Sequence, residues 1–386
     1  MKRMDGTDRD RGSCQRYAMI SRMRITATLC ACLLLASCAL ERPPSGVGPA
    51  PSPGEARALI DESLPRSVPD RAGWIADIQA GFTVQDLPLT RESVCAVIAV
   101  IEQESSFHVN PVIPGLGAIA WREIDSRARR AGVPPPLVHA ALELQSPDGK
   151  TYSRRIDAAR TEKDLSDIYE DFIGSVPLGN RLFASLNPIR TRGPMQVNVA
   201  FATQYAATKP YPYPLKGSIA DELFTRRGSV YFGIAHLFAY QPPYDEYLFR
   251  FADFNAGQFA SRNAAFQSAL SKASGMPVTT DGALLPGKGA DAVPGETELA
   301  LRTLASRLNV DDREIHAALE EGRTRDLEQT PVYERIFALA ERKTGHRLPR
   351  AIIPVIRLQG PKISRSLTTS WYAHRVEGRF EQCLGK

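Results

Sequence analysis

The sequence predicts a mainly α-helical protein, and three observations support this fold class. Apolar residues recur mostly three and four positions apart, which places them on one face of a helix. Alternation of apolar and polar residues, which is typical of strands, is scarce among the 386 residues. A stretch rich in Gly and Pro at 275–295 interrupts the helical pattern, so we expect a linker or a long loop there.

The apolar periodicity predicts the helices in chain order. Before the break they are expected at 55–63, 70–81, 91–107, 134–145, 161–173, 197–207, 219–225, 228–240, 245–256 and 258–274. After the break they are expected at 297–308, 311–321, 330–344 and 349–357. Thr90 is a plausible N-cap for the helix at 91–107, because its hydroxyl can accept a bond from a free backbone N–H. We therefore expect a helical domain over 55–274 and a C-terminal helical region over 296–386.

The first 37 residues have the features of a secretory signal. Two arginines precede an apolar run at 25–35, which is too short to span a bilayer. The run closes on Leu35-Ala36-Ser37-Cys38, which resembles the lipobox of bacterial lipoproteins. That resemblance implies cleavage before Cys38 and attachment of lipid to its sulfur. An ordinary secretory signal or an uncleaved N-terminal anchor would also contain such an apolar run.

A lipid on Cys38 would hold the protein to a membrane of the bacterial cell envelope. Ala39 follows the cysteine where an aspartate would signal retention in the inner membrane, so the resemblance favours the outer membrane. Residues 38–54 are rich in Pro and Gly and are expected to form a tether between the lipid and the helical domain.

The charge balance argues against nucleic acid as a partner. Residues 1–37 carry seven of the 48 Lys and Arg residues and three of the 43 Asp and Glu residues, which leaves 41 basic and 40 acidic residues beyond them. This nearly neutral remainder contains no dense basic run.

Two cysteines remain after the signal peptide and the lipidated Cys38 are set aside. Cys95 and Cys383 are expected to form a disulfide in an oxidising periplasm, which would tie the C-terminal tail to the helix at 91–107. The alternative is one buried free thiol and one thiol in a frayed tail. No Cys-x-x-Cys motif is present and the six histidines are scattered, so neither a metal site nor another cofactor is expected.

Glu104 lies near the end of the most apolar of these helices. It follows Ile101 by three residues and Val97 by seven, so helical geometry places all three on nearly the same side. Glu102 points away from Val97 and is expected at the surface. An apolar wall disfavours the charged form of a carboxyl group and raises its pKa towards the range of a general acid. The simpler alternative is a helix-end glutamate that is exposed or paired with an arginine.

Three segments carry motifs in a fixed order. They are Glu104-Ser105-Ser106-Phe107, then Gly193-Pro194-Met195-Gln196, then Ala252-Asp253-Phe254-Asn255-Ala256-Gly257 after the apolar helix at 228–240. In this order they resemble the lysozyme-like lytic transglycosylases, which implies a goose-type helical core over about residues 70–270. The chain as a whole resembles a proteobacterial lipoprotein family of unknown function.

The lytic transglycosylase resemblance implies that Glu104 is the catalytic acid/base and that peptidoglycan glycan strands are the substrate. The residues that would line the substrate cleft are Ser105, Gly193, Met195, Gln196, Phe254 and Asn255. Met195 could pack under a sugar ring, and Gln196 could bond an amide of the substrate. Asn255 fits a helix C-cap equally well.

The chain departs from the family pattern in three places. Some 88 residues separate Glu104 from Gly193, so an insert at about 112–190 could roof or fill the cleft. Pro194 stands where the family usually has leucine, and Phe254 stands where it usually has tyrosine. Two functions therefore stay open. The first is a lipid-anchored peptidoglycan lytic enzyme, and the second is a non-catalytic outer-membrane lipoprotein that binds glycan or a partner through the same scaffold.

Overall fold

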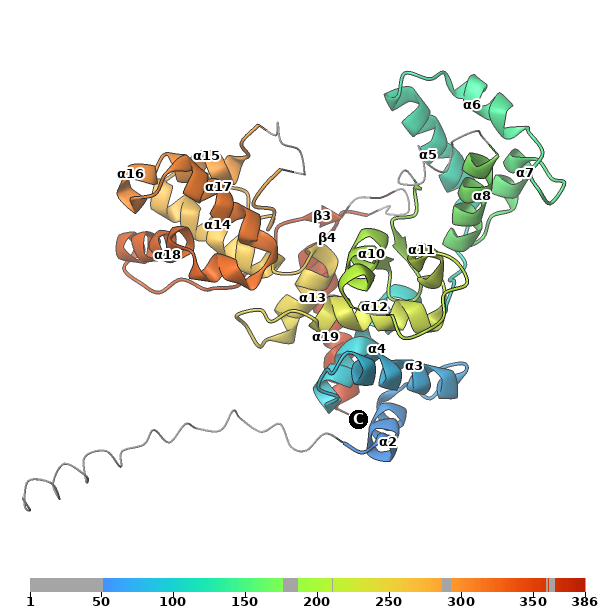
Figure 1. Cartoon of the computed structure of the whole chain (residues 1–386), viewed down its shortest axis with the longest axis horizontal. Coiled ribbons are helices and arrows are strands. Elements are labelled where there is room, and N and C mark those ends of the chain that lie inside the picture. The colour runs from blue at the N-terminus through green and yellow to red at the C-terminus, as the bar shows by residue number, and fades with distance from the viewer. Residues whose placement is uncertain are drawn as a thin grey trace, which may run out of the picture. The chain divides into compact units, whose positions relative to one another are not determined.

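The computed structural model describes residues 51–175, 187–209, 211–286, 293–358, 360 and 365–385. The expected signal peptide, Cys38 and most of the tether lie outside these residues, as do parts of the insert and of the linker. The described residues are mainly helical, as the sequence predicts (Figure 1). None of the described helices combines the length and the apolar character needed to cross a membrane.

The helices before the expected linker are α2 (Pro53–Ser63), α3 (Arg71–Val84), α4 (Arg91–Ser105), α5 (Leu116–Arg130), α6 (Pro135–Leu142), α7 (Tyr152–Ala158), α8 (Glu162–Gly174), α10 (Val199–Thr208), α11 (Ile219–Glu222), α12 (Arg226–Phe238), α13 (Tyr247–Ala256) and α14 (Ala260–Ser274). Those after it are α15 (Glu296–Arg302), α16 (Ala305–Leu308), α17 (Asp312–Glu320), the 3-10 turns η2 (Glu321–Arg323) and η3 (Arg325–Gln329), α18 (Pro331–Thr344) and α19 (Thr369–Leu384). Two antiparallel ribbons complete the described structure: β1 (Thr191–Arg192) pairs with β2 (Val197–Asn198), and β3 (Arg357–Leu358) pairs with β4 (Leu367–Thr368).

The prediction of a helix at 349–357 is wrong. This segment is extended, and its backbone bonds to distant parts of the chain: Ile352 N–H donates to the Ser261 carbonyl, and Val355 N–H donates to the Thr280 carbonyl. Pro354 also removes a donor that a helix would need. Conversely, α5, α7 and α19 are helices that the apolar pattern did not predict.

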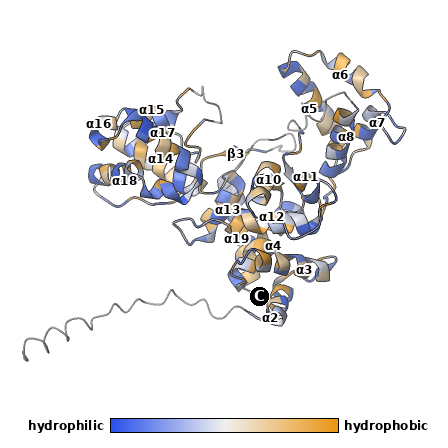
Figure 2. Cartoon of the chain, viewed as in Figure 1, coloured by the Kyte–Doolittle hydropathy of each residue, from blue (hydrophilic) through white to orange (hydrophobic). Residues whose placement is uncertain are grey.

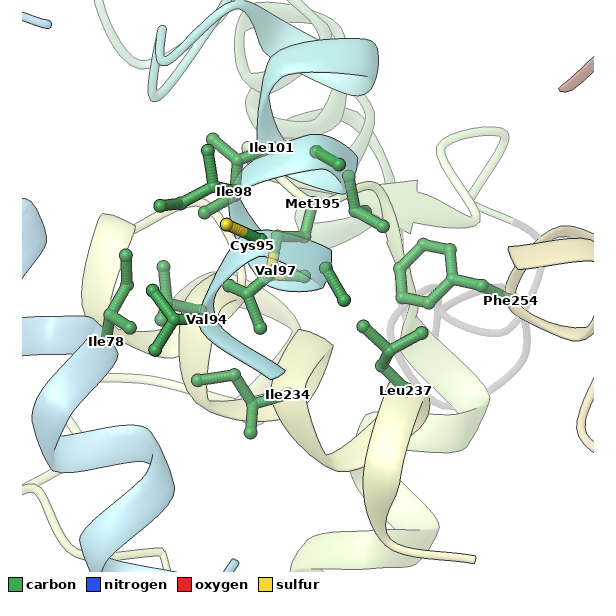
Figure 3. Packing of buried hydrophobic residues seen from close by; sticks show 14 of the residues in the cluster. Ile78, Val94, Cys95, Val97, Ile98, Ile101, Met195, Ile234, Leu237 and Phe254 are labelled. Atoms are coloured by element: carbon green, nitrogen blue, oxygen red, sulfur yellow. The ribbon is translucent and has the colours of Figure 1, made fainter. Parts of the chain in front are cut away.

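Helix α4 forms the centre of the first hydrophobic cluster. Every residue from Ser93 to Ile101 is buried, which is typical of a helix that other elements surround. Its neighbours in the cluster come from α2, α3, α12, α13 and α19. Figure 3 shows Ile78, Ile234, Leu237 and Phe254 around this helix.

Helix α19 packs on α4 and α13, although it is the last helix of the chain. A disulfide joins Cys95 to Cys383, and their Cα atoms are 5.5 Å apart. The disulfide lies near the start of α4 and near the end of α19, while Glu104 at the end of α4 interacts with Tyr372 near the start of α19. The two helices are therefore antiparallel and are linked at both ends.

The hydrophobic clusters group the helices differently from the expected division at 275–295. Helix α14, expected in the first domain, packs with α15 and α18 in a second cluster. Helix α19, expected in the C-terminal region, belongs to the first cluster. The insert has a third cluster of its own over α5–α8. All three clusters and the disulfide lie within one compact unit, Pro51–Lys386.

Candidate functional site

Glu104 lies in the last turn of α4, and the local backbone explains why the helix stops there. Ser106 and Phe107 have φ angles of 48° and 63°, in the left-handed region that ends a helix. Glu104 is a partly exposed residue. Glu102, which was expected at the surface, is partly buried as well. The neighbours of these two glutamates, rather than their exposure, therefore distinguish them.

Tyr372 is the neighbour that marks Glu104. Its ring is buried, and its hydroxyl interacts with the Glu104 carboxylate without making a hydrogen bond of ordinary geometry. Burial raises the pKa of the Tyr372 hydroxyl well above its usual value, and the charge of Glu104 raises it further. The hydroxyl therefore stays protonated beside the carboxylate and is available as a donor.

The sequence contains a signal that could have found Tyr372. Nine residues separate Cys95 from Glu104, and eleven separate Tyr372 from Cys383. If two antiparallel helices are joined at the cysteines, these nearly equal spacings bring residues 104 and 372 to the same level. If the tail had been recognised as a helix, the expected disulfide would have indicated Tyr372 as a neighbour of Glu104.

Asn255 is linked to the same end of α19. Its side-chain oxygen accepts a hydrogen bond from the Thr369 hydroxyl at 2.8 Å. Thr369 lies three residues before Tyr372, and both belong to the buried face of α19. Asn255 is not a C-cap, because α13 continues to Ala256 and its C-cap is Gly257. The first turn of α19 therefore contacts both Glu104 and Asn255.

Phe254 packs into a row of aromatic rings. Its ring centre lies 4.8 Å from that of His236, which lies 4.6 Å from that of Phe201 on α10. Burial lowers the pKa of His236 to about 4, so its ring is uncharged at neutral pH. The row joins α10, which follows the second motif, to α13, which carries the third.

The second motif forms the turn between β1 and β2, and its glycine and methionine serve the fold. Gly193 has a φ of 73°, and a Cβ atom there would lie 1.9 Å from the Leu223 carbonyl oxygen. Met195 is fully buried and fills the space left by the missing side chain of Gly233. The expectation that Met195 packs under a sugar ring is therefore wrong, because no part of this side chain is exposed. Gly193 likewise allows close packing within the protein rather than the approach of a ligand.

Ser105 and Gln196 are also engaged within the protein. The Ser105 side chain is buried, and its hydroxyl donates to the Ile101 carbonyl at 3.0 Å, so its expected contact with substrate is not supported. The Gln196 amide oxygen accepts from the Thr191 hydroxyl at 2.9 Å. Its amide nitrogen donates to a Glu162 carboxylate oxygen at 2.9 Å. Gln196 is partly exposed, but both ends of its amide are in use.

Helix α8 of the insert provides these contacts to the turn. Glu162 is its first residue, and Glu170, two turns later, pairs with Arg192 at 3.2 Å. Arg192 is almost completely buried beside Gly193, so this pair is shielded from water on one side. The insert therefore binds the turn of the second motif through two carboxylates.

A hollow of about 440 Å³ lies elsewhere, against α2 and α3. Its lining residues are Gly54, Arg57, Ala58, Asp61, Arg71, Ala72 and Ile75. None of them belongs to the three motifs. Across the described parts of the chain, His, Cys, Asp and Glu residues form no group of three or more that could hold a metal ion.

The comparisons with known proteins place the chain in a family. Residues 67–386 match the family described as "Protein of unknown function (DUF1615)". The chain belongs to this family. The matched range includes the residues of the insert and of α19.

A relative from Escherichia coli (strain K12), named "Uncharacterized protein YaiW", is similar along nearly its whole length. It is 47% identical over 357 residues, which are 92% of this chain and 97% of the relative. No solved structure gives a significant match.

Proposed function

We propose that this protein is a lipid-anchored lytic enzyme of the lytic transglycosylase type, which cleaves peptidoglycan glycan strands in the bacterial cell envelope. The observation that carries the proposal is the placement of Glu104. It is a partly exposed carboxylate at the end of a helix whose preceding turns are buried, and the Tyr372 hydroxyl lies beside it. Asn255 reaches the same end of α19 through Thr369.

The proposed reaction uses Glu104 twice. As an acid, it gives its proton to the oxygen of the glycosidic bond while that bond breaks and the N-acetyl oxygen of the same sugar bonds to its C1. As a base, the resulting carboxylate takes the proton from the 6-hydroxyl of that sugar. The 6-oxygen then bonds to C1 and displaces the N-acetyl oxygen, which leaves a 1,6-anhydro end and returns the enzyme to its protonated form.

Tyr372 and Asn255 are positioning residues in this proposal. A protonated hydroxyl beside the carboxylate can donate to its charged form and hold its orientation. Asn255 fixes the first turn of α19 through the Thr369 hydroxyl, and this turn carries Tyr372. The fold of the first cluster around α4 is proposed to be lysozyme-like, with α19 as its last helix.

The N-terminal sequence around Cys38 supports the proposed location of the enzyme. Lipid on Cys38 would hold the enzyme to a membrane, which we propose to be the outer membrane. The tether would then let the helical body reach the peptidoglycan layer. Peptidoglycan and the membrane are the proposed partners, and no cofactor is required by the reaction.

The experiment uses residues 51–386 on purified sacculi, with released muropeptides identified by mass. We expect anhydro-muropeptides from the wild-type protein and at least a hundredfold less from Glu104→Gln. Glu102→Gln is the matched control, because Glu102 is on the same helix and is also partly buried; it should retain activity. The proposed lytic activity would be refuted if Glu104→Gln released muropeptides as fast as the wild type. It would also be refuted if the wild type released none over a range of pH and salt.

One observation favours a second function, binding without cleavage. Both ends of the Gln196 amide are hydrogen-bonded within the protein, so this residue does not offer a free amide to a sugar. A non-catalytic envelope lipoprotein would bind glycan or a partner through the same scaffold. Cosedimentation with sacculi without release of muropeptides, unchanged in Glu104→Gln, would support this function over the enzyme.

A further inference from the structure

Helix α6 of the insert exposes an unusual amount of apolar surface. Of its eight residues, only Leu142 is buried, and that residue joins the third hydrophobic cluster. Leu137 on the helix and Leu144 just after it are 63% and 59% exposed, and Val133 just before it is 39% exposed. Figure 2 shows orange residues along α6 beside the blue end of α5. Single exposed apolar side chains are common on soluble proteins, whereas several gathered in one short segment mark a candidate interaction surface.

Basic residues lie next to this apolar run. We call residues 127–144 the α5–α6 corner. Within the corner the chain has three arginines, at positions 127, 129 and 130, and one carboxylate, the exposed Glu143. Arg127 and Arg130 both pair with Glu123, one turn or more back on α5, and both stay largely exposed. Arg129 is exposed and makes no ion pair with any described residue.

The combination of exposed leucines and arginines identifies the kind of surface that the corner fits. Apolar side chains beside arginines match the boundary of a lipid bilayer, where acyl chains lie just beneath phosphate groups. A purely apolar protein groove would not use the arginines, and a purely acidic protein would not use the leucines. The charge therefore favours a membrane that contains anionic phospholipid.

We propose that the α5–α6 corner docks on an anionic membrane surface, with Leu137 and Leu144 entering the interface and Arg129 facing the phosphate groups. This contact is separate from the lipid on Cys38 and does not depend on lytic activity. A single weak membrane attachment is readily reversible, whereas two attachments on one molecule hold it firmly. The corner would thus fix how the body lies on the membrane, which the lipid on Cys38 alone would not do.

The test measures cosedimentation of residues 51–386, which lack the lipid, with phosphatidylethanolamine vesicles that contain phosphatidylglycerol. Phosphatidylcholine vesicles serve as the neutral comparison. We expect binding to the anionic vesicles that weakens as salt is raised. The double variant Leu137→Ser, Leu144→Ser should bind at least tenfold more weakly, and Arg129→Ser should bind about fivefold more weakly to anionic vesicles alone.

The matched controls are Leu299→Ser and Arg313→Ser, which change exposed residues of α15 and α17 outside the insert. They should leave vesicle binding unchanged, and thermal unfolding should show that every variant is folded. Three results would overturn the proposal. They are no binding to anionic vesicles, equal binding to both kinds of vesicle, and binding that the corner variants do not weaken. Self-association of the wild type that the leucine variants abolish would instead assign the corner to a second copy of the chain.

Discussion

The two halves of the candidate site are held in different ways. The half around Glu104 is completed by α19, whose first turn supplies Tyr372 to the carboxylate and Thr369 to Asn255. The half around Gln196 is held by α8 of the insert and by β1, because Glu162 and Thr191 occupy the two ends of its amide. Helix α19 therefore adds side chains to the first half. In the second half, Glu162 of the insert already occupies the amide nitrogen of Gln196.

This difference shows what each of the two segments does at the candidate site. Both segments lie inside the range that matches the family. His236 stands between the halves, because its ring packs against Phe201 after the turn and against Phe254 before Asn255. A change in α19 should disturb the first half alone, and a change in α8 should disturb the second alone.

The largest effect is expected from removing the disulfide. Cys95 and Cys383 are 288 positions apart, so their bond closes a long loop and restricts the unfolded chain. The double variant Cys95→Ser, Cys383→Ser should lower the free energy of unfolding by about 2–5 kcal/mol. Hydrogen exchange should then rise in α19 more than in β1 and β2, because α19 loses its covalent attachment to α4.

Two controls accompany this measurement. Each single serine variant should lose as much stability as the double variant, and reduction of the wild type should reproduce the loss. If thiol labelling of the non-reduced protein finds both cysteines free, the disulfide does not form in the protein.

Much of the first half could be predicted from the sequence, and its completion could not. The continuous apolar run of α4 predicted the helix, and two cysteines in an expected oxidising compartment predicted the bond to the tail. Helix α19 escaped prediction, although its buried residues recur three and four apart. Gly378 interrupts its middle, and Trp371, which is 42% exposed, adds a large apolar side chain on the wrong face.

The second half shows a different limit of prediction. The motif at Gly193 was visible, but the partners of its side chains were not. The bond between Gln196 and Glu162 joins residues 34 positions apart on different elements, and no periodicity encodes such a contact. The buried position of Met195 depends on Gly233, which the sequence shows only as a glycine within an apolar helix.

The second-largest effect on stability is expected from His236, which lies between the two halves. His236 has a folded-state pKa of about 4, below its ordinary value near 6.5, because burial disfavours the charged ring. Its contribution to stability is complete above pH 6.5 and is lost as the pH falls through 4, by at most about 3 kcal/mol. His236→Phe keeps an aromatic ring between Phe201 and Phe254 but cannot take up a proton.

Urea unfolding at several pH values measures this effect. Between pH 6.5 and 4 the wild type should lose more stability than His236→Phe. His374→Phe is the control, because His374 is an exposed histidine of α19. Parallel curves for the wild type and His236→Phe would contradict the assignment.

A smaller effect is expected where the insert meets the turn. Glu162→Ala removes the carboxylate that accepts from the Gln196 amide, and it should lower the free energy of unfolding by about 1 kcal/mol. The amide nitrogen would keep its bond to the Gly193 carbonyl at 3.3 Å but lose the partner of its other N–H, so binding of sacculi should strengthen. Glu162→Gln is the control, because its amide oxygen can still accept the bond. If the two variants bind sacculi equally well, the bond does not limit access to Gln196.

The smallest effect on stability is expected from Tyr372→Phe, and it separates folding from chemistry in the first half. The Tyr372 hydroxyl makes no hydrogen bond of ordinary geometry, so its removal should change the free energy of unfolding by less than about 1 kcal/mol. The same removal takes a donor from beside Glu104, whose carboxylate should then hold its proton to higher pH. The pH profile of muropeptide release should therefore move upward while the unfolding temperature stays constant. Tyr333→Phe, at a buried tyrosine of α18 in the second cluster, should leave that profile where it is. An unchanged profile in Tyr372→Phe would show that the hydroxyl only fills space beside α4, and the link between the last helix and the acid would then be one of packing alone.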